Sequence, residues 1–480
     1  MLCCGSAATA GPASSVASPV SSQPAGEGGR WQRLAQALAV PGLRGAEISA
    51  LVLDRRTGEP LFARSPDRLL IPASTQKLLT ATAVLARFGP AHRFATQVLA
   101  NAPPDARGEV ADLFVRGSDP AMTSEQWWRL AADLHAAGLC RVGGDLVLDD
   151  GRLDDQRWHP SWGPVSVRAY HAAIGALSAN YGAFRVIVRP GAGPGAPARV
   201  QLDPPVSYLE VADRARTAGP GGRPALTVTR ELLPSSERVV VSGTIPRDRE
   251  RVEVWRSVAR PALYAGAVLR MQLEANGIPV AGRLRRAAAP DHAAFRYDFE
   301  GLPLARVVAL ALKYSNNFIA EVLVKQLGFL FSGRARPGSW ANGIPALRSS
   351  LAQLGVDLGP ARLVDGSGLS RSNRLSARML ATTLRRADAA FGFGPELLAA
   401  LPLAAEDGTL AERADGASGR LRAKTGSLDG VTGLAGLART VEGRDVVFAL
   451  LVNGTGARER AAVAAVDGFA AALVEGGARP

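Results

Sequence analysis

Ser74 and Lys77 stand three positions apart in the segment Ser74-Thr-Gln-Lys77, which leads into an Ala- and Leu-rich run. Residues at positions i and i+3 of a helix lie on one face, so the amine comes within reach of the hydroxyl. A serine becomes a strong nucleophile when a base removes its proton, and a lysine whose pKa is lowered by burial can be that base. The pair therefore predicts a nucleophilic serine at or near the beginning of a helix.

Lysine is scarce in this chain, which gives the pair more weight. Only four of the 56 basic residues are lysines: Lys77, Lys313, Lys325 and Lys424. Arginine stays protonated and cannot serve as a base, so a lysine kept at a motif position indicates a specific role. Taken alone, Ser-x-x-Lys is a common pattern, and Ser74 is equally explained as a helix N-cap.

A second segment, Tyr314-Ser-Asn-Asn317, falls at a break between two helical patterns. At such a break the Ser315 hydroxyl and the Asn317 amide can point into a cleft. The alternative interpretation is a polar turn between helices, which needs no chemistry.

A third segment, Lys424-Thr-Gly-Ser427, precedes a strand-like run. It would set a cation and two hydroxyls along the edge of a sheet, with Gly426 allowing a substrate backbone to approach closely. In isolation, a strand with a solvated lysine and a glycine bulge explains it equally well.

In this order, Ser-x-x-Lys, Ser-x-Asn and Lys-Thr-Gly are the motifs of penicillin-binding proteins and serine β-lactamases, which the chain resembles. Roughly 240 residues separate Ser74 from Ser315, far more than in compact β-lactamases. The chain is therefore most similar to the low-molecular-mass penicillin-binding proteins that are D-Ala-D-Ala carboxypeptidases and endopeptidases with a large insertion between the first two motifs. Further similar stretches extend the resemblance from about residue 46 to residue 454: Gly117–Pro120, Gly144–Asp149, Val241–Pro246, Leu312–Asn317 and Asp365–Ser370.

The resemblance implies a role for each motif residue. Ser74 would be the acylated nucleophile and Lys77 the general base. Ser315 would relay a proton to the leaving group, Asn317 would hold the substrate backbone, and Lys424 would supply positive potential and orient Ser315.

The resemblance also implies how substrate is held. Thr425 and Ser427 would bind the terminal carboxylate, and the backbone N–H groups of Ser74 and Ser427 would form an oxyanion hole. The implied substrates are peptidoglycan stem peptides, with β-lactams as inhibitors that acylate Ser74. The chemistry needs no metal or cofactor.

Two acidic positions bear on specificity. In similar proteins an aspartate of the inserted region recognises the free amine of a diaminopimelate side chain, and Asp154 is the best match in position. It belongs to an acidic cluster, Asp149, Asp150, Asp154 and Asp155, which is also explained as a solvated turn and, less well, as a cation site. Asp429 departs from the family pattern of Ser or Gln, and an acid there could weaken carboxylate binding.

The elements that position these residues come from both ends of the chain. Two strand pairs are expected around turn signals, followed by an Ala-rich helix over about 458–474 and a buried helical pair over 303–329. The expected strands are 46–53 and 60–64, and 430–440 and 445–453. The expected fold class is α/β (α+β), a transpeptidase domain of the penicillin-binding-protein/β-lactamase type with an antiparallel sheet flanked by helices and an inserted β-rich region.

This organisation divides the chain into three parts. Residues 1–30, rich in Ala, Ser, Gly and Pro, are expected to be a disordered leader or a signal remnant. Residues 31–93 and 291–480 would form the catalytic domain. Residues 94–290 would be the insertion, with two sub-domains suggested by Gly/Pro-rich loops.

Composition narrows the remaining function classes. The net charge of +13 is scattered rather than clustered and no nucleic-acid motif accompanies it, so no nucleic-acid partner is expected. No run approaches the 18 to 20 apolar residues of a transmembrane helix. Three cysteines and five dispersed histidines form no zinc motif, and no Gly-x-Ser-x-Gly elbow is present.

A wall-directed enzyme should act outside the cytoplasm, in the periplasm or its equivalent, although the first 30 residues lack a basic start and an apolar core typical of a signal. Leu2-Cys-Cys-Gly5 is a loose match to a lipoprotein signal. Two other functions stay open: a β-lactamase or esterase on the same fold, and a non-catalytic wall-binding protein. The sequence leaves open the oligomeric state and the choice between carboxypeptidase and endopeptidase activity.

Overall fold

A five-stranded antiparallel sheet joins the two ends of the chain in the computed structural model, which describes residues 27–475. The central pair is β1, from the N-terminal part, and β18, from the C-terminal part, in register from Glu47↔Asn453 to Asp54↔Val446. The strand order is β16 (Leu421–Leu428), β17 (Val431–Arg439), β18 (Asp445–Asn453), β1 (Glu47–Asp54) and β2 (Pro60–Arg64). This order leaves β16 at one edge of the sheet.

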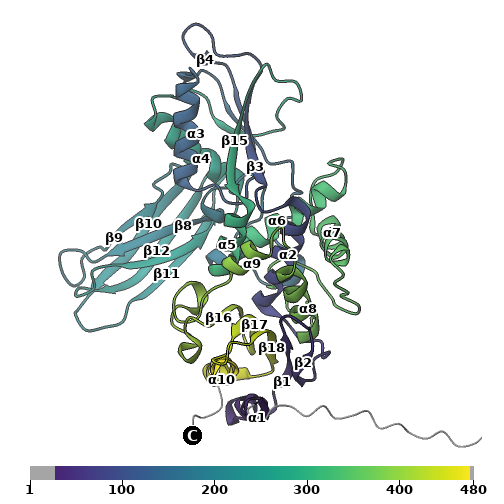
Figure 1. Cartoon of the computed structure of the whole chain (residues 1–480). Helices are drawn as coiled ribbons and strands as arrows, with labels where there is room; N and C mark the ends of the chain where they lie inside the picture. Colours follow the sequence, from purple (N-terminus) through teal and green to yellow (C-terminus); the bar gives the residue numbers. More distant parts are fainter. Residues whose placement is uncertain (1–26, 476–480) are drawn as a thin grey trace, which may run out of the picture.

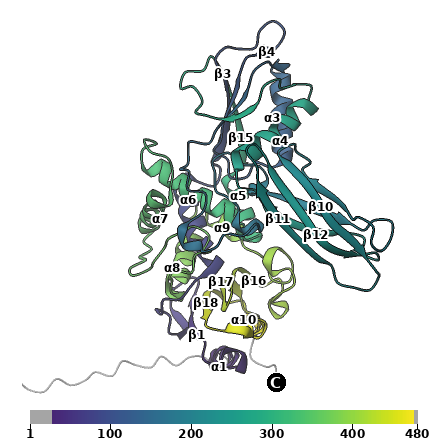
Figure 2. The same ribbon diagram turned by 180° about the vertical axis from the view of Figure 1, so that it is seen from behind.

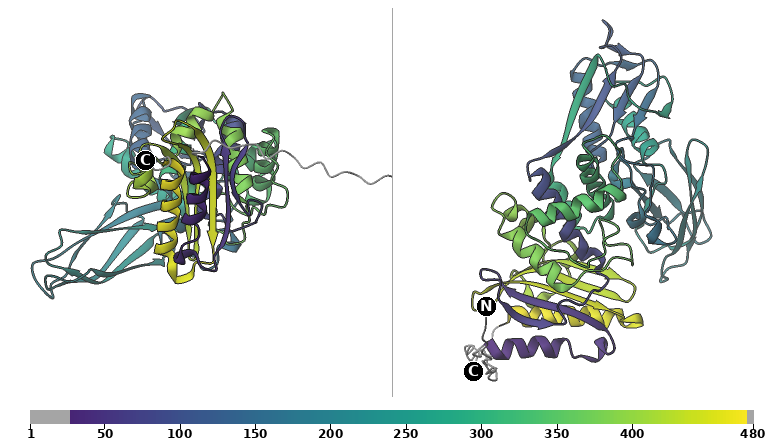
Figure 3. Two further views of the ribbon diagram at one scale, coloured as in Figure 1. Left: turned by 60° about the horizontal axis from the view of Figure 1, so that its bottom comes forward. Right: turned by 90° about the vertical axis from the view of Figure 1, so that its right-hand side faces the viewer.

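Both faces of this sheet are covered by helices (Figure 3). The helices α1 (Glu27–Ala37) and α10 (Glu459–Val474) lie side by side against one face, where Val52, Phe448 and Phe469 are buried. The alternate residues of the same strands, including Leu51 and Ala449, face a separate core on the other side. Successive side chains of a strand point to opposite faces of the sheet. Both sets of alternate residues are apolar here because both faces of the sheet are buried.

The second face carries a layer of helices around α2 (Lys77–Phe88), whose residues 77–85 are all buried. Its neighbours are α5 (Leu304–Lys313), α6 (Asn317–Phe331), α7 (Trp340–Gln353), α8 (Ala377–Asp388) and α9 (Gly394–Ala400). A helix that is apolar on all sides requires neighbours on all sides, so α2 occupies the centre of this layer.

The region between α2 and α5 builds the upper part and the long arm of the molecule (Figures 1 and 2). A mixed sheet in the order β14-β7-β5-β3-β15 packs on α3 (Ser124–Ala136) and α4 (Pro261–Ala275). Its strands are β3 (Arg93–Ala100), β5 (Leu113–Arg116), β7 (Leu146–Asp149), β14 (Leu284–Arg286) and β15 (Phe295–Pro303), with a short pair of β4 (Glu109–Val110) and β6 (Arg141–Val142) nearby.

The arm consists of two three-stranded sheets, in the orders β13-β8-β9 and β10-β12-β11. Their strands are β8 (Ala183–Arg189), β9 (Arg199–Asp203), β10 (Leu209–Ala218), β11 (Ala225–Leu232), β12 (Glu237–Pro246) and β13 (Val252–Ser257). Core residues of the arm belong to the same buried cluster as α3 and α4. The arm is therefore packed onto the upper sheet rather than tethered to it by a linker.

The strands and helices expected at the chain ends agree with the structure to within one residue or two, and the α/β fold with its antiparallel sheet is confirmed. The division into domains stays a prediction. One of its boundaries would cut the upper sheet, because β15 lies beyond residue 290 and pairs with β3; we propose residue 303 instead. Residues 27–30 of the expected leader lie in α1, and the rest of it lies outside the described residues.

No helix within residues 27–475 is both long enough and apolar enough to cross a bilayer.

Candidate active site

Ser74 lies on a tight 3-10 turn, η2 (Ala73–Gln76), that runs directly into α2. Ala73 adopts a φ of 47°, in the left-handed region, and so turns the chain sharply before the serine. The prediction of a position at a helix start is confirmed, although the helix proper begins at Lys77. The side chain of Ser74 is half-buried and reaches a pocket, while its neighbours in the turn are buried.

The Lys77 amine is buried beside the serine. It donates hydrogen bonds to Ser74 Oγ at 2.9 Å, to Asn317 Oδ1 at 2.7 Å and to the backbone oxygen of Ser367 at 2.9 Å. Burial lowers the pKa of Lys77 to about 7; the Glu321 and Asp365 carboxylates raise it, but by less than burial lowers it. A lysine in this state can accept a proton at neutral pH.

The loop between α5 and α6 presents Ser315 and Asn317 to the same pocket. Ser315 has a φ of 54°, and Asn316 caps α6 by accepting a hydrogen bond from the Ile319 N–H. The Asn317 amide nitrogen donates to the backbone oxygen of Tyr170 at 3.0 Å, while its oxygen holds Lys77. Asn317 therefore connects the first two motifs with the inserted region.

The third motif lies on the edge strand β16. The Lys424 amine is fully buried and donates to the Thr425 backbone oxygen at 2.9 Å, and burial holds its pKa well below the usual value. Thr425 Oγ1 donates to Thr409 Oγ1 at 2.8 Å, while Ser427 is exposed at the pocket. Among the described residues no hydrogen bond joins Lys424 to Ser315. The orientation of Ser315 by Lys424 therefore stays a prediction that no direct contact supports.

Gly426 lies where β16 passes the turn that carries Ser74. A Cβ at this position would lie 2.8 Å from the Pro72 backbone oxygen and 3.3 Å from the Ala73 Cβ. The absent side chain therefore allows β16 to pack against the turn that carries Ser74, and the close approach of a substrate backbone at Gly426 stays a prediction. The glycine thereby fixes the distance between the first and third motifs.

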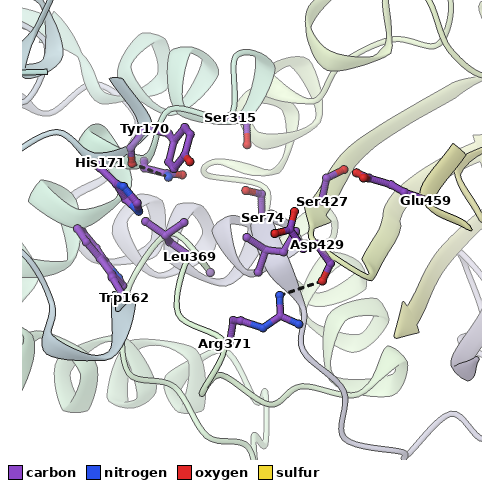
Figure 4. A pocket seen from close by; sticks show the side chains of 13 residues that line it. Ser74, Trp162, Tyr170, His171, Ser315, Leu369, Arg371, Ser427, Asp429 and Glu459 are labelled. Atoms are coloured by element: carbon purple, nitrogen blue, oxygen red, sulfur yellow. Dashed lines mark hydrogen bonds between the residues drawn. The ribbon is translucent and has the colours of Figure 1, made fainter. Parts of the chain in front are cut away.

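Ser74, Ser315, Asn317 and Ser427 of the three motifs line a pocket of about 480 Å³ (Figure 4). Trp162, Tyr170 and His171 line one side, and Ser427, Asp429 and Glu459 line the opposite side, with the Ser74 hydroxyl between them. The remaining lining residues are Ser315, Asn317, Gly368, Leu369, Arg371 and Leu428. The Arg371 guanidinium donates to the Asp429 backbone oxygen at 2.9 Å, which links two loops at the mouth of the pocket. Asp429, the departure noted in the sequence, is thus a pocket residue.

Asp154 does not line this pocket. Its carboxylate accepts a hydrogen bond at 2.6 Å from the amine of Lys325, which is fully buried and lies 3.8 Å from the centre of the Trp340 ring. The recognition of a substrate amine by Asp154 stays a prediction, and the contact with Lys325 favours a structural role. The neighbouring Asp150 and Asp155 are bound by Arg157 and Arg286.

Within residues 27–475, no group of three His, Cys, Asp or Glu side chains converges as a metal site.

Sequence reasoning missed the groups that hold the pocket together. They are the buried Glu321 and Asp365, which bind the loop 365–370 behind Lys77, and the backbone oxygens of Ser367 and Tyr170. The stretch Asp365–Ser370 was recognised as similar to the family, but backbone acceptors leave no trace in residue types. Glu321 carried one signal, since it is an acid in an otherwise apolar stretch of α6.

Fold and site define a serine peptidase of the penicillin-binding class, and comparison with known proteins supports this. Residues 31–473 match the D-Ala-D-Ala carboxypeptidase 3 (S13) family. The chain belongs to this family of serine-type D-Ala-D-Ala carboxypeptidases.

Individual relatives and a solved structure are similar to this chain over most of its length. A D-alanyl-D-alanine carboxypeptidase of Actinomadura sp. (strain R39) is 36% identical over 432 residues, which is 86% of this chain and 79% of the relative. D-alanyl-D-alanine carboxypeptidase DacB of Haemophilus influenzae is 27% identical over 80% of this chain and 81% of its own length. The crystal structure of penicillin binding protein 4 (dacB) from Haemophilus influenzae has the same fold, with a TM-score of 0.77 at 24% identity, covering 92% of this chain and 98% of the other.

Proposed function

We propose that Ser74 and Lys77 are the nucleophile and the general base of this peptidase, acting on the D-Ala-D-Ala end or the D-amino-acid cross-links of peptidoglycan stem peptides. The observation that carries the proposal is the buried amine of Lys77, 2.9 Å from Ser74 Oγ and with a pKa lowered to about 7. A neutral amine at this distance can take the hydroxyl proton as the oxygen attacks a carbonyl carbon.

The reaction then has two halves. In the first, Ser74 Oγ forms a bond to the carbonyl carbon of the penultimate D-Ala and Lys77 takes the Ser74 proton. The C–N bond then breaks as Ser315 gives its proton to the leaving nitrogen, and the proton on Lys77 passes to Ser315, which leaves Lys77 neutral again. In the second, water attacks the ester carbon and Lys77 accepts a proton from it; the C–O bond to Ser74 then breaks, and Lys77 returns the proton to Ser74 Oγ, which frees the shortened peptide and restores the hydroxyl. Backbone N–H groups of Ser74 and Ser427 would hold the developing oxyanion.

Substrate binding is assigned to the third motif and its surroundings. Ser427, which is exposed at the pocket, and the largely buried Thr425 would hold the terminal carboxylate. Lys424 would contribute positive potential from behind the strand, and Asn317 would hold the peptide backbone. A β-lactam would acylate Ser74 by the same route and be released slowly; a penicillin binding protein 4 related in fold has been crystallised with a β-lactam.

We also propose that the protein works outside the cytoplasm, because its substrate, the peptidoglycan, lies there. Fractionation of cells expressing the gene with its upstream codons included should recover the protein outside the cytoplasm. Recovery in the cytoplasm alone would contradict this location.

Intact-mass spectrometry after incubation with benzylpenicillin tests the catalytic assignment. The wild type should gain the mass of one penicillin, and Ser74→Ala and Lys77→Arg should not. If penicillin is destroyed without an adduct, a β-lactamase is indicated. If penicillin stays intact and no adduct forms, a non-catalytic wall-binding protein is indicated.

A further inference from the structure

Glu321 is a fully buried carboxylate that the reaction does not use. It lies on α6 and accepts hydrogen bonds at 2.8 Å from the backbone N–H groups of Gly366 and Ser367, and at 2.7 Å from the Trp340 indole. Burying a carboxylate is costly unless its oxygens are well bonded, and here each oxygen accepts at least one such bond. The carboxylate therefore fixes the backbone of residues 366 and 367 in one position.

The same loop is held from its own side by Asp365, also fully buried. Asp365 Oδ1 accepts from the Gly368 N–H at 2.9 Å and from Asn373 at 2.8 Å, and Oδ2 accepts from the Trp162 indole at 2.9 Å and the Ser370 N–H at 2.7 Å. Two carboxylates thus clamp a loop of six residues, 365–370. A loop without helix or strand hydrogen bonds becomes rigid when its backbone donors are satisfied in this way.

The loop in turn supports the base. The Ser367 backbone oxygen accepts a hydrogen bond from the Lys77 amine at 2.9 Å, while the Ser367 N–H donates to Glu321. We propose that Glu321 is a positioning residue, which sets the Ser367 carbonyl and through it holds the Lys77 amine against the Ser74 hydroxyl. The proposal rests on the proposed function of Lys77 as the base.

Glu321 also acts on Lys77 through its charge. The charged groups that face the Lys77 amine are Glu321 on α6, Asp365 on the loop and Lys424 on β16. The two carboxylates oppose the effect of burial, so they keep the pKa of Lys77 higher than burial alone would leave it. Removal of the charge on Glu321 should therefore lower the pKa of Lys77 further.

Glu321 itself faces other ionisable groups. Burial, and then the Asp365 carboxylate, raise the pKa of Glu321 above its usual range. Beyond Trp340 lie Lys325, paired with Asp154, and His159, whose ring contacts the indole. A substitution of Glu321 can therefore affect Lys77 in two ways: it can displace the Lys77 amine through the Ser367 backbone, or change the pKa of Lys77 by removing a nearby charge.

The test is the pH profile of acylation by benzylpenicillin in wild type, Glu321→Gln and a matched control, Glu237→Gln. Glu237 is also fully buried and accepts hydrogen bonds from a tyrosine hydroxyl, Tyr208, and from the Ala259 and Arg260 N–H groups. It belongs to the arm, away from Ser74. Both substitutions remove one buried charge, and Glu237→Gln also removes the charge that faces Arg230 at 3.4 Å, so both should lower the melting temperature.

Only Glu321→Gln should change the reaction. We expect the maximal acylation rate to fall by about 10- to 100-fold, as for a displaced catalytic group. We expect the apparent binding constant for penicillin to change little, and the midpoint of the profile to move to lower pH. Glu321→Asp keeps the charge, but its shorter side chain moves the carboxylate oxygens away from their donors. It should therefore reduce the acylation rate while the midpoint of the pH profile stays close to that of the wild type.

The outcomes separate the two proposals. If wild type is not acylated, the proposed function of Lys77 and Ser74 fails first. If wild type is acylated and Glu321→Gln has the same midpoint and a rate no lower than Glu237→Gln, the positioning role is wrong. If Glu321→Gln does not fold, Trp340→Phe removes a single donor to Glu321 while keeping a ring in place; a rate equal to the wild type would then also overturn the proposal.

Discussion

The Lys77 amine lies 2.7 Å from Asn317 Oδ1, closer than its 2.9 Å contact with Ser74 Oγ, so the second motif holds the lysine of the first. All three hydrogen-bond acceptors of this amine are uncharged oxygens, and within residues 27–475 no carboxylate bonds to it directly. This arrangement lets burial lower the pKa, because the ammonium form has no close counterion.

The first prediction follows from this pKa. The reacting amine must be neutral, and its neutral fraction falls about tenfold for each pH unit below the pKa. With a pKa of about 7 for Lys77, the rate of acylation by benzylpenicillin should rise with pH through about 7 and level off above it. Stopped-flow or quenched-mass measurements between pH 5 and 9 provide the profile. A rate that is flat through this range would contradict the role of Lys77.

The second prediction concerns Gly368. Its φ is 80°, and a Cβ would lie 1.9 Å from the Ala73 backbone oxygen, in the turn that carries Ser74. Gly368→Ala should lower the melting temperature and slow acylation, because either the loop or the turn must move. Gly454→Ala is the matched control, with a φ of 79° and nothing within 4 Å of the new Cβ. It should cost only the strain of the left-handed backbone, about 1–2 kcal/mol, and leave acylation unchanged. Equal effects of both variants on acylation would show that Gly368 is not tied to the nucleophile.

The third prediction separates a structural from a substrate-binding Asp154. Asp154→Asn leaves the buried Lys325 ammonium with a weaker partner, so the free energy of unfolding should fall by about 1–3 kcal/mol. Asp155→Asn, at an exposed carboxylate, should change it less. Urea unfolding of the two variants measures both values.

Kinetics complete this comparison. The ratio of kcat/KM for stem peptides with and without a free side-chain amine should be the same in wild type and Asp154→Asn. A ratio that falls in Asp154→Asn alone would support amine recognition by Asp154.

The fourth prediction concerns charge at the mouth of the pocket. Asp429 and Glu459 are exposed carboxylates beside Ser427, where the substrate carboxylate is expected. Asp429→Asn should lower KM for a short D-Ala-D-Ala peptide by about two- to fivefold, since exposed charge interactions are worth up to about 1 kcal/mol. The value of kcat should hardly change, and added salt should reduce the difference. Asp415→Asn, an exposed acid outside the pocket lining, should leave KM unchanged; a similar decrease in both variants would point to net charge alone.

Much of the site could be predicted because it depends on residue types at short spacing. Ser74 and Lys77 are separated by one turn, and their contact follows from that spacing alone. The strands near both ends were predictable from apolar runs around turns such as Thr57-Gly58. The pairing of β1 with β18 was not predicted, because a sequence shows strands and not their partners.

Other parts of the site could not be predicted from the sequence because they depend on backbone atoms and on long-range packing. Ser367 acts through its carbonyl, which every residue has, and the reason for Gly426 became visible only when β16 lay against Pro72. Asp154 was chosen by position along the chain, and the partner that holds it, Lys325, is 171 residues away. Charged residues whose partners lie so far along the chain cannot be assigned by local patterns.

The place of β1 in the sheet has a consequence for the time at which the enzyme becomes active. β1 lies between β2 and β18, and the turn of Ser74 is packed against β16, so the proposed nucleophile is supported by strands that the ribosome makes last. Until residue 453 has been synthesised, β1 has an unpaired edge and the turn of Ser74 has no strand behind it. The newly made chain therefore carries Ser74 without a formed pocket, and the hydrolysis proposed for it requires that the final hairpin first close the sheet.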